Sequence, residues 1–273
     1  MITFRRAGVS ALLIAAFALV GLSFASPAEA THAWGGYHWA RTDNPFTIKL
    51  GDNVGLAWDS TLATASGDWS FSGVLDTSVV AGGTSAQKGR NTPKNCIPTA
   101  GRDEICNAAY GATGWLGIAQ IWVSGGVHIT QGTVKLNDTY FSTVLYNTPA
   151  WRALVACQEI GHTFGLDHQD EHFDNPNLGT CMDYTNDPST NQHPNAHDYE
   201  ELDIIYAHLD TFTTISSSLP SKHGASALAQ SADFTNASEW GRSTGKDAKG
   251  RDNQFERDLD SGVKLITHVF WVN

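Results

Sequence analysis

Beginning at Gln158, one short stretch of the chain has the residue types and spacing needed to hold a metal ion and hydrolyse a bond. Gln158 and His162 are four positions apart, so on a helix they lie on one face, with Glu159 beside them. Two metal ligands at this spacing with an adjacent glutamate are typical of a hydrolytic zinc site. Gly165 is suited to a left-handed turn that ends the helix. Such a turn would bring His168 to the same metal.

This stretch resembles the metzincin signature, His-Glu-x-x-His-x-x-Gly-x-x-His, at every fixed position except the first, where the chain has Gln158. A second landmark follows His168 by fourteen residues: Met182, in the string Gly-Thr-Cys-Met-Asp-Tyr. Metzincins place a methionine in a tight turn beneath the metal. Tyr184 stands where the astacin and serralysin branches carry a tyrosine that can approach the metal. The resemblance implies that Zn²⁺ is held by Gln158, His162 and His168.

The resemblance also implies an activity, that of a matrixin-like zinc endopeptidase acting on an extended peptide or protein substrate. Glu159 is expected to act as the general base, taking a proton from water and returning it to the leaving amine. Tyr184 is expected to donate a hydrogen bond to the developing oxyanion. Gly165 and Met182 are expected to have structural roles at the site.

The glutamine at the first ligand position leaves several interpretations open. Gln158 is neutral and has a carbonyl lone pair, so it could bind zinc, although more weakly than an imidazole. Alternatively, the chain is a binding protein that keeps the metzincin fold and has lost metal and catalysis, or His172 replaces the missing ligand. In the least specific interpretation, His162 and His168 are ordinary histidines of the core or surface. Glu159 favours the enzyme, because hydrolysis needs this carboxylate and a structural helix does not.

Other hydrolase classes have little support. There is no Gly-x-Ser-x-Gly elbow, and the four cysteines suggest two disulfides. Four cysteines allow three pairings. Cys96 and Cys106 frame a short polar segment, so a local bridge is the simplest choice, and Cys157 would then pair with Cys181. The metzincin resemblance implies that the segments of this second pair lie against each other.

Residues 1–30 have the pattern of a signal peptide. Two arginines precede an apolar run over residues 7–25, and a small-x-small cleavage pattern ends at residue 30. No stop-transfer segment follows, so export is favoured over a permanent membrane anchor. The chain carries a net charge of −11, which makes nucleic acid an unfavourable partner. We expect a secreted, extracellular monomer.

Periodicity and turn residues predict a strand, a helix, three further strands and then the metal-binding helix. The predicted strands cover residues 46–50, 70–80, 116–123 and 127–136, and the predicted helices cover residues 54–66, 149–163 and 195–210. The resemblance implies an α+β fold, in which a twisted, mixed five-stranded sheet lies over the metal-binding helix. A smaller, irregular C-terminal subdomain is expected to contain the methionine turn and one long helix. Residues 117–123 are expected to be the edge strand that pairs with substrate, or else an ordinary buried strand.

We therefore expect a signal peptide over residues 1–30, a metzincin-like catalytic domain over 31–210 and a C-terminal extension over 211–273. The extension is rich in small and polar residues and is expected to be largely irregular, with a final strand where residues 263–272 alternate. The loop at 169–177 contains carboxylate and amide oxygens suited to Ca²⁺. It lacks the EF-hand spacing, so a solvated loop is favoured.

Overall fold

The computed structural model describes Met1 and residues 31–83, 94–215 and 234–273. Apart from Met1, the predicted signal peptide lies outside the described residues. Thr31–Asn273 form one compact unit that combines a large sheet with a few helices, so the mixed helix and sheet architecture is as expected. Among the described residues, no helix is both long enough and apolar enough to cross a membrane.

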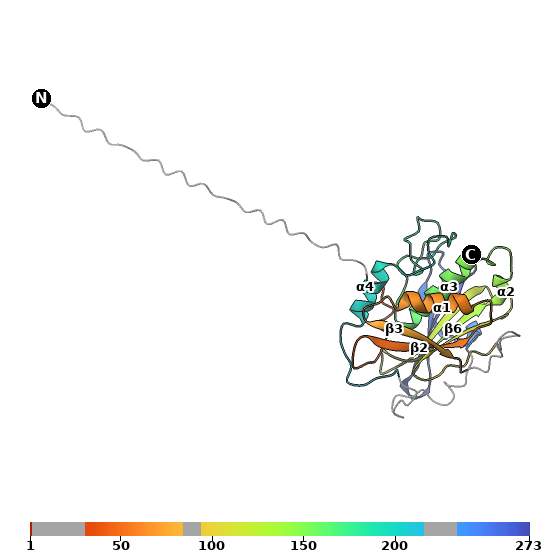
Figure 1. The fold of residues 1–273 in the computed structure, drawn as a ribbon, viewed down its shortest axis with the longest axis horizontal. Helices are drawn as coiled ribbons and strands as arrows, with labels where there is room; N and C mark the ends of the chain where they lie inside the picture. The colour runs from red at the N-terminus through yellow and green to blue at the C-terminus, as the bar shows by residue number, and fades with distance from the viewer. Residues whose placement is uncertain (2–30, 84–93, 216–233) are drawn as a thin grey trace. The chain divides into compact units, whose positions relative to one another are not determined.

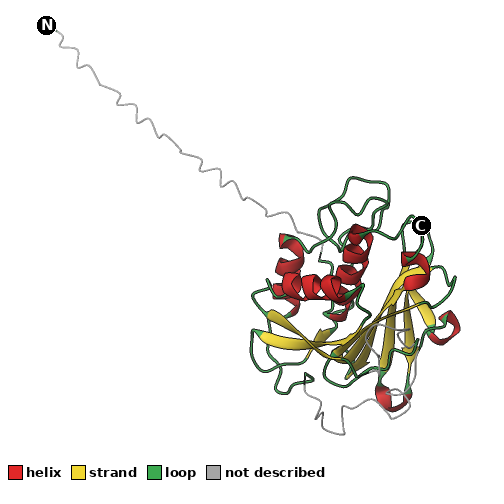
Figure 2. Ribbon diagram, turned by 45° about the vertical axis from the view of Figure 1, so that its right-hand side comes forward, coloured by secondary structure: helices red, strands yellow, loops and turns green. Residues whose placement is uncertain are grey.

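Among the described residues, the sheet contains nine strands rather than the expected five, in the order β3-β2-β4-β6-β5-β9-β8-β7, with β1 paired to β6. Figures 1 and 2 show the large twisted sheet. The strands are parallel from β3 to β6 and antiparallel from β6 to β7. Their bounds are β1 His38–Trp39, β2 Phe46–Asn53, β3 Leu75–Ala81, β4 Asp103–Ala108, β5 Trp115–Ser124, β6 His128–Asn137, β7 Arg242–Lys246, β8 Asp252–Asp258 and β9 Lys264–Trp271.

The helices are α1 Asp59–Trp69, α2 Asp138–Phe141, α3 Pro149–Thr163 and α4 Ala196–Ile205, with 3₁₀ turns at Ala237–Glu239 and Asp260–Gly262. Figure 2 shows the longer helices together on one side of the sheet. α3 is the predicted metal-binding helix. The Thr148 side chain caps its first turn by accepting a hydrogen bond from the Trp151 backbone N–H at 3.2 Å, and Pro149 occupies the first helical position.

The turn after α3 forms as predicted. Gly165 has a φ of +94°, which favours glycine, and a Cβ there would collide with the backbone carbonyl oxygen of Tyr37. The Gly165 N–H donates to the carbonyl of His162 at 3.1 Å. The chain therefore leaves the helix one turn after His162 and passes back toward the same face.

Residues 216–233 of the expected extension lie outside the described residues, and its described part contributes β7, β8 and β9 to the sheet. β9, with Phe255 of β8, packs in a second hydrophobic cluster on the sheet face opposite the main core. Apolar residues of β9 alternate between the two cores: Leu265 and Val269 pack in the second cluster, and Ile266 and Phe270 in the first. The final strand predicted from residues 263–272 is therefore present, and it is buried on both faces.

The prediction that residues 117–123 form an edge strand that pairs with substrate is wrong, because β5 lies inside the sheet. It is hydrogen-bonded to β6 on one side and to β9 on the other, with Gly117 opposite Phe270 and Val123 opposite Lys264. All residues of β5 are buried. The alternative interpretation of residues 117–123, a buried strand, is the correct one. β4 was missed because its residues were assigned to a polar loop between Cys96 and Cys106.

Candidate metal centre

Three histidines from three segments meet beside the C-terminal half of α3. His162 belongs to α3, His168 follows the Gly165 turn, and His268 lies on β9. One ligand nitrogen from each lies within 4.8 Å of the others. His162 and His268 have no exposed surface, and His168 is 8% exposed. The structure thus brings together the two predicted histidines and adds a third that sequence analysis missed.

Hydrogen bonds to one nitrogen of each ring leave the other nitrogen without a partner. His162 Nδ1 lies 2.8 Å from the carbonyl oxygen of Leu166, and His168 Nδ1 lies 3.0 Å from Glu171 Oε1. Both acceptors require a proton on Nδ1, so in the neutral form of each ring Nε2 carries the lone pair. Neither Nε2 atom has a hydrogen-bond partner among the described residues. Metal-binding histidines are oriented by second contacts of this kind.

His268 shows the same pattern with its nitrogens exchanged. Its Nε2 lies 3.2 Å from the hydroxyl of Tyr184, and its Nδ1 has no hydrogen-bond partner among the described residues. Burial lowers the pKa of His162 and of His268 well below the usual range, and the neighbouring histidines lower both further. Both rings are therefore neutral at pH 7, the form that binds a metal.

Gln158 is fully buried and has its side-chain nitrogen committed. Nε2 donates to the carbonyl oxygen of Cys181 at 2.7 Å. Because Cys181 offers an acceptor, the amide cannot be turned the other way without losing this bond. Oε1 has no hydrogen-bond partner among the described residues. The oxygen remains free to bind a metal, so the ligand role of Gln158 stays a prediction.

Glu159 is also fully buried, with Oε2 3.7 Å from His268 Nδ1. Burial raises the pKa of this carboxyl well above its usual range, and the backbone N–H of Ala119 opposes the rise only in part. Gly117 on β5 provides the space for the Glu159 carboxyl group. A Cβ at this position would come within 2.6 Å of Glu159 Oε1.

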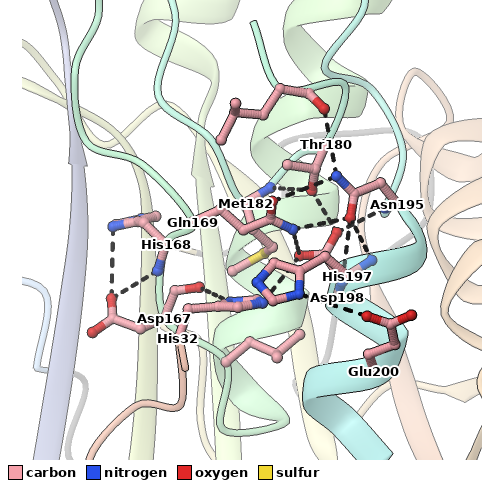
Figure 3. A network of polar contacts seen from close by, with 12 residues as sticks. His32, Asp167, His168, Gln169, Thr180, Met182, Asn195, His197, Asp198 and Glu200 are labelled. Atoms are coloured by element: carbon pink, nitrogen blue, oxygen red, sulfur yellow. Dashed lines mark hydrogen bonds and ion pairs between the residues drawn. The ribbon is translucent and has the colours of Figure 1, made fainter. Parts of the chain in front are cut away.

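Met182 lies against the metal-binding helix. A Cβ on Gly161 would lie 2.7 Å from Met182 Sδ, so the glycine permits this close approach. The Met182 backbone N–H donates to Thr180 Oγ1 at 3.0 Å, and the Gln169 N–H donates to the Met182 carbonyl oxygen at 2.7 Å; Figure 3 shows the surrounding polar network. Met182 therefore packs against the helix that carries His162, and its structural role at the centre stays a prediction.

Both disulfides form as expected, Cys96–Cys106 and Cys157–Cys181. The second connects α3 to the methionine turn. It lies next to Gln158 in sequence and fixes the carbonyl that accepts its hydrogen bond. The covalent link therefore joins two of the segments that surround the centre.

Tyr184 adjoins the centre but points its hydroxyl at His268. Its ring centroid lies 4.2 Å from that of His168, and burial raises the pKa of the phenol well above its usual range. Asn253 Nδ2 also donates to the hydroxyl, at 3.5 Å.

The remaining sequence candidates lie outside the histidine cluster. The His172 side chain is 72% exposed and pairs with Asp170 instead. In the loop expected to suit Ca²⁺, Glu171 accepts from His168 and from Asn253, so one of its oxygens is already used for positioning.

His268 could not be identified from sequence, although the alternation around it predicted its strand. Its place depends on the register of β9, which sets His268 opposite Ala119 on β5. A shift by one residue would turn the ring to the other face of the sheet. Register between strands so distant in the chain carries no local sequence signal.

Comparison with known proteins finds no family model that matches this chain and no matching curated relative. The interpretation of the centre therefore depends on its own residues and geometry.

Proposed function

We propose that the chain is a secreted zinc-dependent endopeptidase whose metal is held by His162, His168 and His268. The observation that carries this proposal is the convergence of three imidazoles, each with one nitrogen that has no hydrogen-bond partner among the described residues, beside a buried glutamate. Zinc sites of hydrolases use three protein ligands, and imidazole suits the metal well. Gln158 Oε1 is the alternative third ligand predicted from the sequence.

Bound Zn²⁺ would supply Lewis acidity to a water molecule and to a peptide carbonyl. Glu159 would take the proton from that water and return it to the leaving amine. Burial raises the pKa of Glu159, which suits this role because a more basic carboxylate takes up the proton of water more readily. The low polarity around Glu159 also strengthens its interactions with charge that develops during the reaction.

Tyr184 would position His268. If His268 binds the metal through Nδ1, its Nε2–H donates to the Tyr184 hydroxyl, which also accepts from Asn253. The phenolic hydrogen is then left available to donate. This arrangement is compatible with the predicted hydrogen bond to an oxyanion.

One observation favours a second function, that of a metal-binding protein without catalysis. Glu159 has no exposed surface, and β9 occupies the strand position beside β5 where an extended peptide was expected to pair. A peptide could reach Glu159 only if β9 moved away. A protein that only stores or uses the metal structurally has no such requirement.

The test measures zinc content and turnover of an unstructured protein such as casein on the same preparations of wild type and Glu159→Gln. We expect about one zinc at this centre in both, and a loss of turnover by about 10² to 10⁴ in the variant. Turnover by the wild type must also disappear with a chelator and return with zinc.

Zinc binding without turnover in the wild type would support the non-catalytic function instead. Equal turnover in wild type and variant, with zinc in both, would exclude Glu159 as the base and overturn the proposed mechanism.

A further inference from the structure

A second group of histidines gathers around Asp210, and it shares no residue with the first centre. His38 lies on β1, His128 begins β6, and His208 and Asp210 lie in the segment after α4. One ligand atom from each of His38, His208 and Asp210 lies within 4.8 Å of the others, whereas His128 is outside this group and joins it through its contact with Asp210. His38 and His128 are opposite each other in the parallel pairing of β1 with β6. Three separate parts of the chain thus contribute to one cluster.

The polar atoms of the cluster are close together. The Nε2 atoms of His38 and His208 lie 3.2 Å apart. Asp210 Oδ1 lies 3.3 Å from His128 Nε2 and 3.9 Å from His208 Nε2, and Asp210 Oδ2 lies 3.8 Å from His38 Nε2. All three rings therefore direct the same nitrogen, Nε2, toward one carboxylate.

Two of these residues are oriented by contacts on their far side. His38 Nδ1 lies 3.0 Å from the carbonyl oxygen of Gly36, which requires a proton on Nδ1 and leaves the Nε2 lone pair directed into the cluster. Asp210 Oδ2 accepts from the Arg41 backbone N–H at 3.2 Å and from its guanidinium at 3.0 Å. Oδ1 is thereby left to face His128 and His208. Metal ligands are commonly held by outer contacts of this kind.

We propose that His38, His128, His208 and Asp210 form a second metal site that binds a divalent transition-metal ion, with Zn²⁺ the best match to three imidazoles and one carboxylate. Two nitrogens bound to one tetrahedral zinc at about 2.0–2.1 Å would be about 3.3 Å apart, close to the separation between His38 and His208. His38, His208 and Asp210 would be the first three ligands, and His128 would close the site as a structural one when its ring turns from Asp210 to the metal.

The cluster has a simpler alternative, in which the His38 and His208 rings share a hydrogen bond and the others form ion pairs with Asp210. Arg41 already neutralises this carboxylate, so it does not need further cations. Protonation of all three rings would place several positive charges beside Arg41 in a partly buried group. A metal ion uses all the Nε2 lone pairs at once without protonating any ring.

The site lies where the segment after α4 joins the start of the domain. The Asp210 N–H donates to the Arg41 carbonyl at 2.8 Å, and Ala40 and Thr214 exchange two further hydrogen bonds. A metal would strengthen this join by binding the folded form and not the unfolded one. His38 is buried, whereas the His208 side chain is 54% exposed and opens the site to solvent.

The test is zinc stoichiometry on the full chain, with inorganic zinc as the probe, for wild type and His208→Asn. The matched control is His193→Asn. The His193 side chain is 58% exposed and lies 2.7 Å from Asp68 Oδ2, but it belongs to no group of metal ligands found among the described residues. We expect two zinc ions in the wild type and in the control, and one in His208→Asn. The lost site should weaken by at least about 100-fold.

This proposal can be separated from the proposed enzyme site. His162→Ala should remove only the first zinc, and zinc should still raise the melting temperature of that variant. Adding His208→Asn should abolish this remaining response. A second variant, His128→Asn, is measured in the same way. If both variants match the wild type in zinc stoichiometry and in melting temperature, the second metal site does not exist and the hydrogen-bonded alternative is correct.

Discussion

The Nδ1 atom of His268 lies 3.7 Å from Oε2 of Glu159, and neither side chain has exposed surface. Glu159 belongs to the metal-binding helix, whereas His268 belongs to the C-terminal strand β9. Because β9 pairs along β5, the sheet carries His268 to the helix. The extension is therefore part of the candidate metal centre and not an appendage to it.

Replacing His268 with alanine should weaken zinc binding at the first centre by at least about 100-fold, because an imidazole ligand is lost. Isothermal titration with zinc measures the change. His172→Ala is the control: it removes an exposed histidine near the site and should leave the affinity unchanged.

Gln158→Ala distinguishes the two candidates for the third ligand. If His268 holds the metal, this variant should weaken binding less than His268→Ala, by loosening the contact with Cys181. The reverse order, with Gln158→Ala the more damaging, would make the glutamine the ligand and would refute our assignment of His268.

Gly117→Ala should destabilise the protein by about 1–3 kcal/mol, because its Cβ would overlap Glu159 Oε1 and Val155 Cγ1 in a packed interior. Gly67→Ala is the contrasting substitution. Gly67 lies within α1, where a Cβ meets nothing within 4 Å, so alanine should stabilise by about 0.5–1 kcal/mol. Urea unfolding of both variants measures whether each substitution lowers or raises the free energy of unfolding. If Gly117→Ala leaves the free energy of unfolding unchanged, the Glu159 side chain has room to move.

Much of the centre could be predicted because its signals are local. Thr148 and Pro149 mark the helix start, and the glycine turn that brings His168 back follows directly from its sequence. Met182 and the disulfide of the adjacent Cys181 lie within the same short stretch of sequence as the helix. These features depend on capping, turn geometry and helical spacing, which neighbouring residues determine.

The rest depends on pairing between distant segments. The polar composition of residues 211–262 predicted irregular chain, but β7 has no buried residue and β8 has only one, Asn253, so neither strand needs a run of apolar residues. β4 contains Asp103 and Glu104, two buried carboxylates that gave it the composition of a loop. Burial of such groups is decided by partners elsewhere, such as Thr163, whose hydroxyl donates to Asp103.

Removing the disulfide between Cys157 and Cys181 by a double serine substitution should cost roughly 3 kcal/mol of unfolding free energy, from the entropy of the opened loop. Zinc affinity at the first centre should also fall by about tenfold or more, because the carbonyl that holds Gln158 and the adjacent Met182 lose their anchor. Chemical unfolding and zinc titration on the same samples measure both effects.

The matched control is the double serine variant of Cys96 and Cys106. This bridge closes a shorter loop at β4, so its loss should destabilise by a similar or smaller amount and leave zinc affinity unchanged. Equal zinc affinities in the two double variants would show that the methionine turn does not need its disulfide to support the centre.

In the metal-free protein, Glu159 should make stability fall as pH rises. Its folded pKa lies above the unfolded value of 4.5, so the folded state holds this proton more tightly. Above pH 4.5 the unfolded state releases the proton first, and unfolding becomes easier by up to about 1.4 kcal/mol per pH unit until the folded pKa is reached. Glu159→Gln removes this contribution, so its stability advantage over wild type should grow with pH.

Urea unfolding of both proteins with a chelator at pH 5, 6 and 7 measures that growing difference. The lowered pKa values of His162 and His268 act in the opposite direction, since the unfolded state takes up their protons below pH 6.5, but both proteins share this contribution. Glu200→Gln, at a side chain that is 64% exposed on α4, should stay within about 0.5 kcal/mol of wild type throughout. A constant difference between Glu159→Gln and wild type would show that the Glu159 pKa is not raised on folding. Zinc should reduce the difference, because a cation beside Glu159 favours its ionised form.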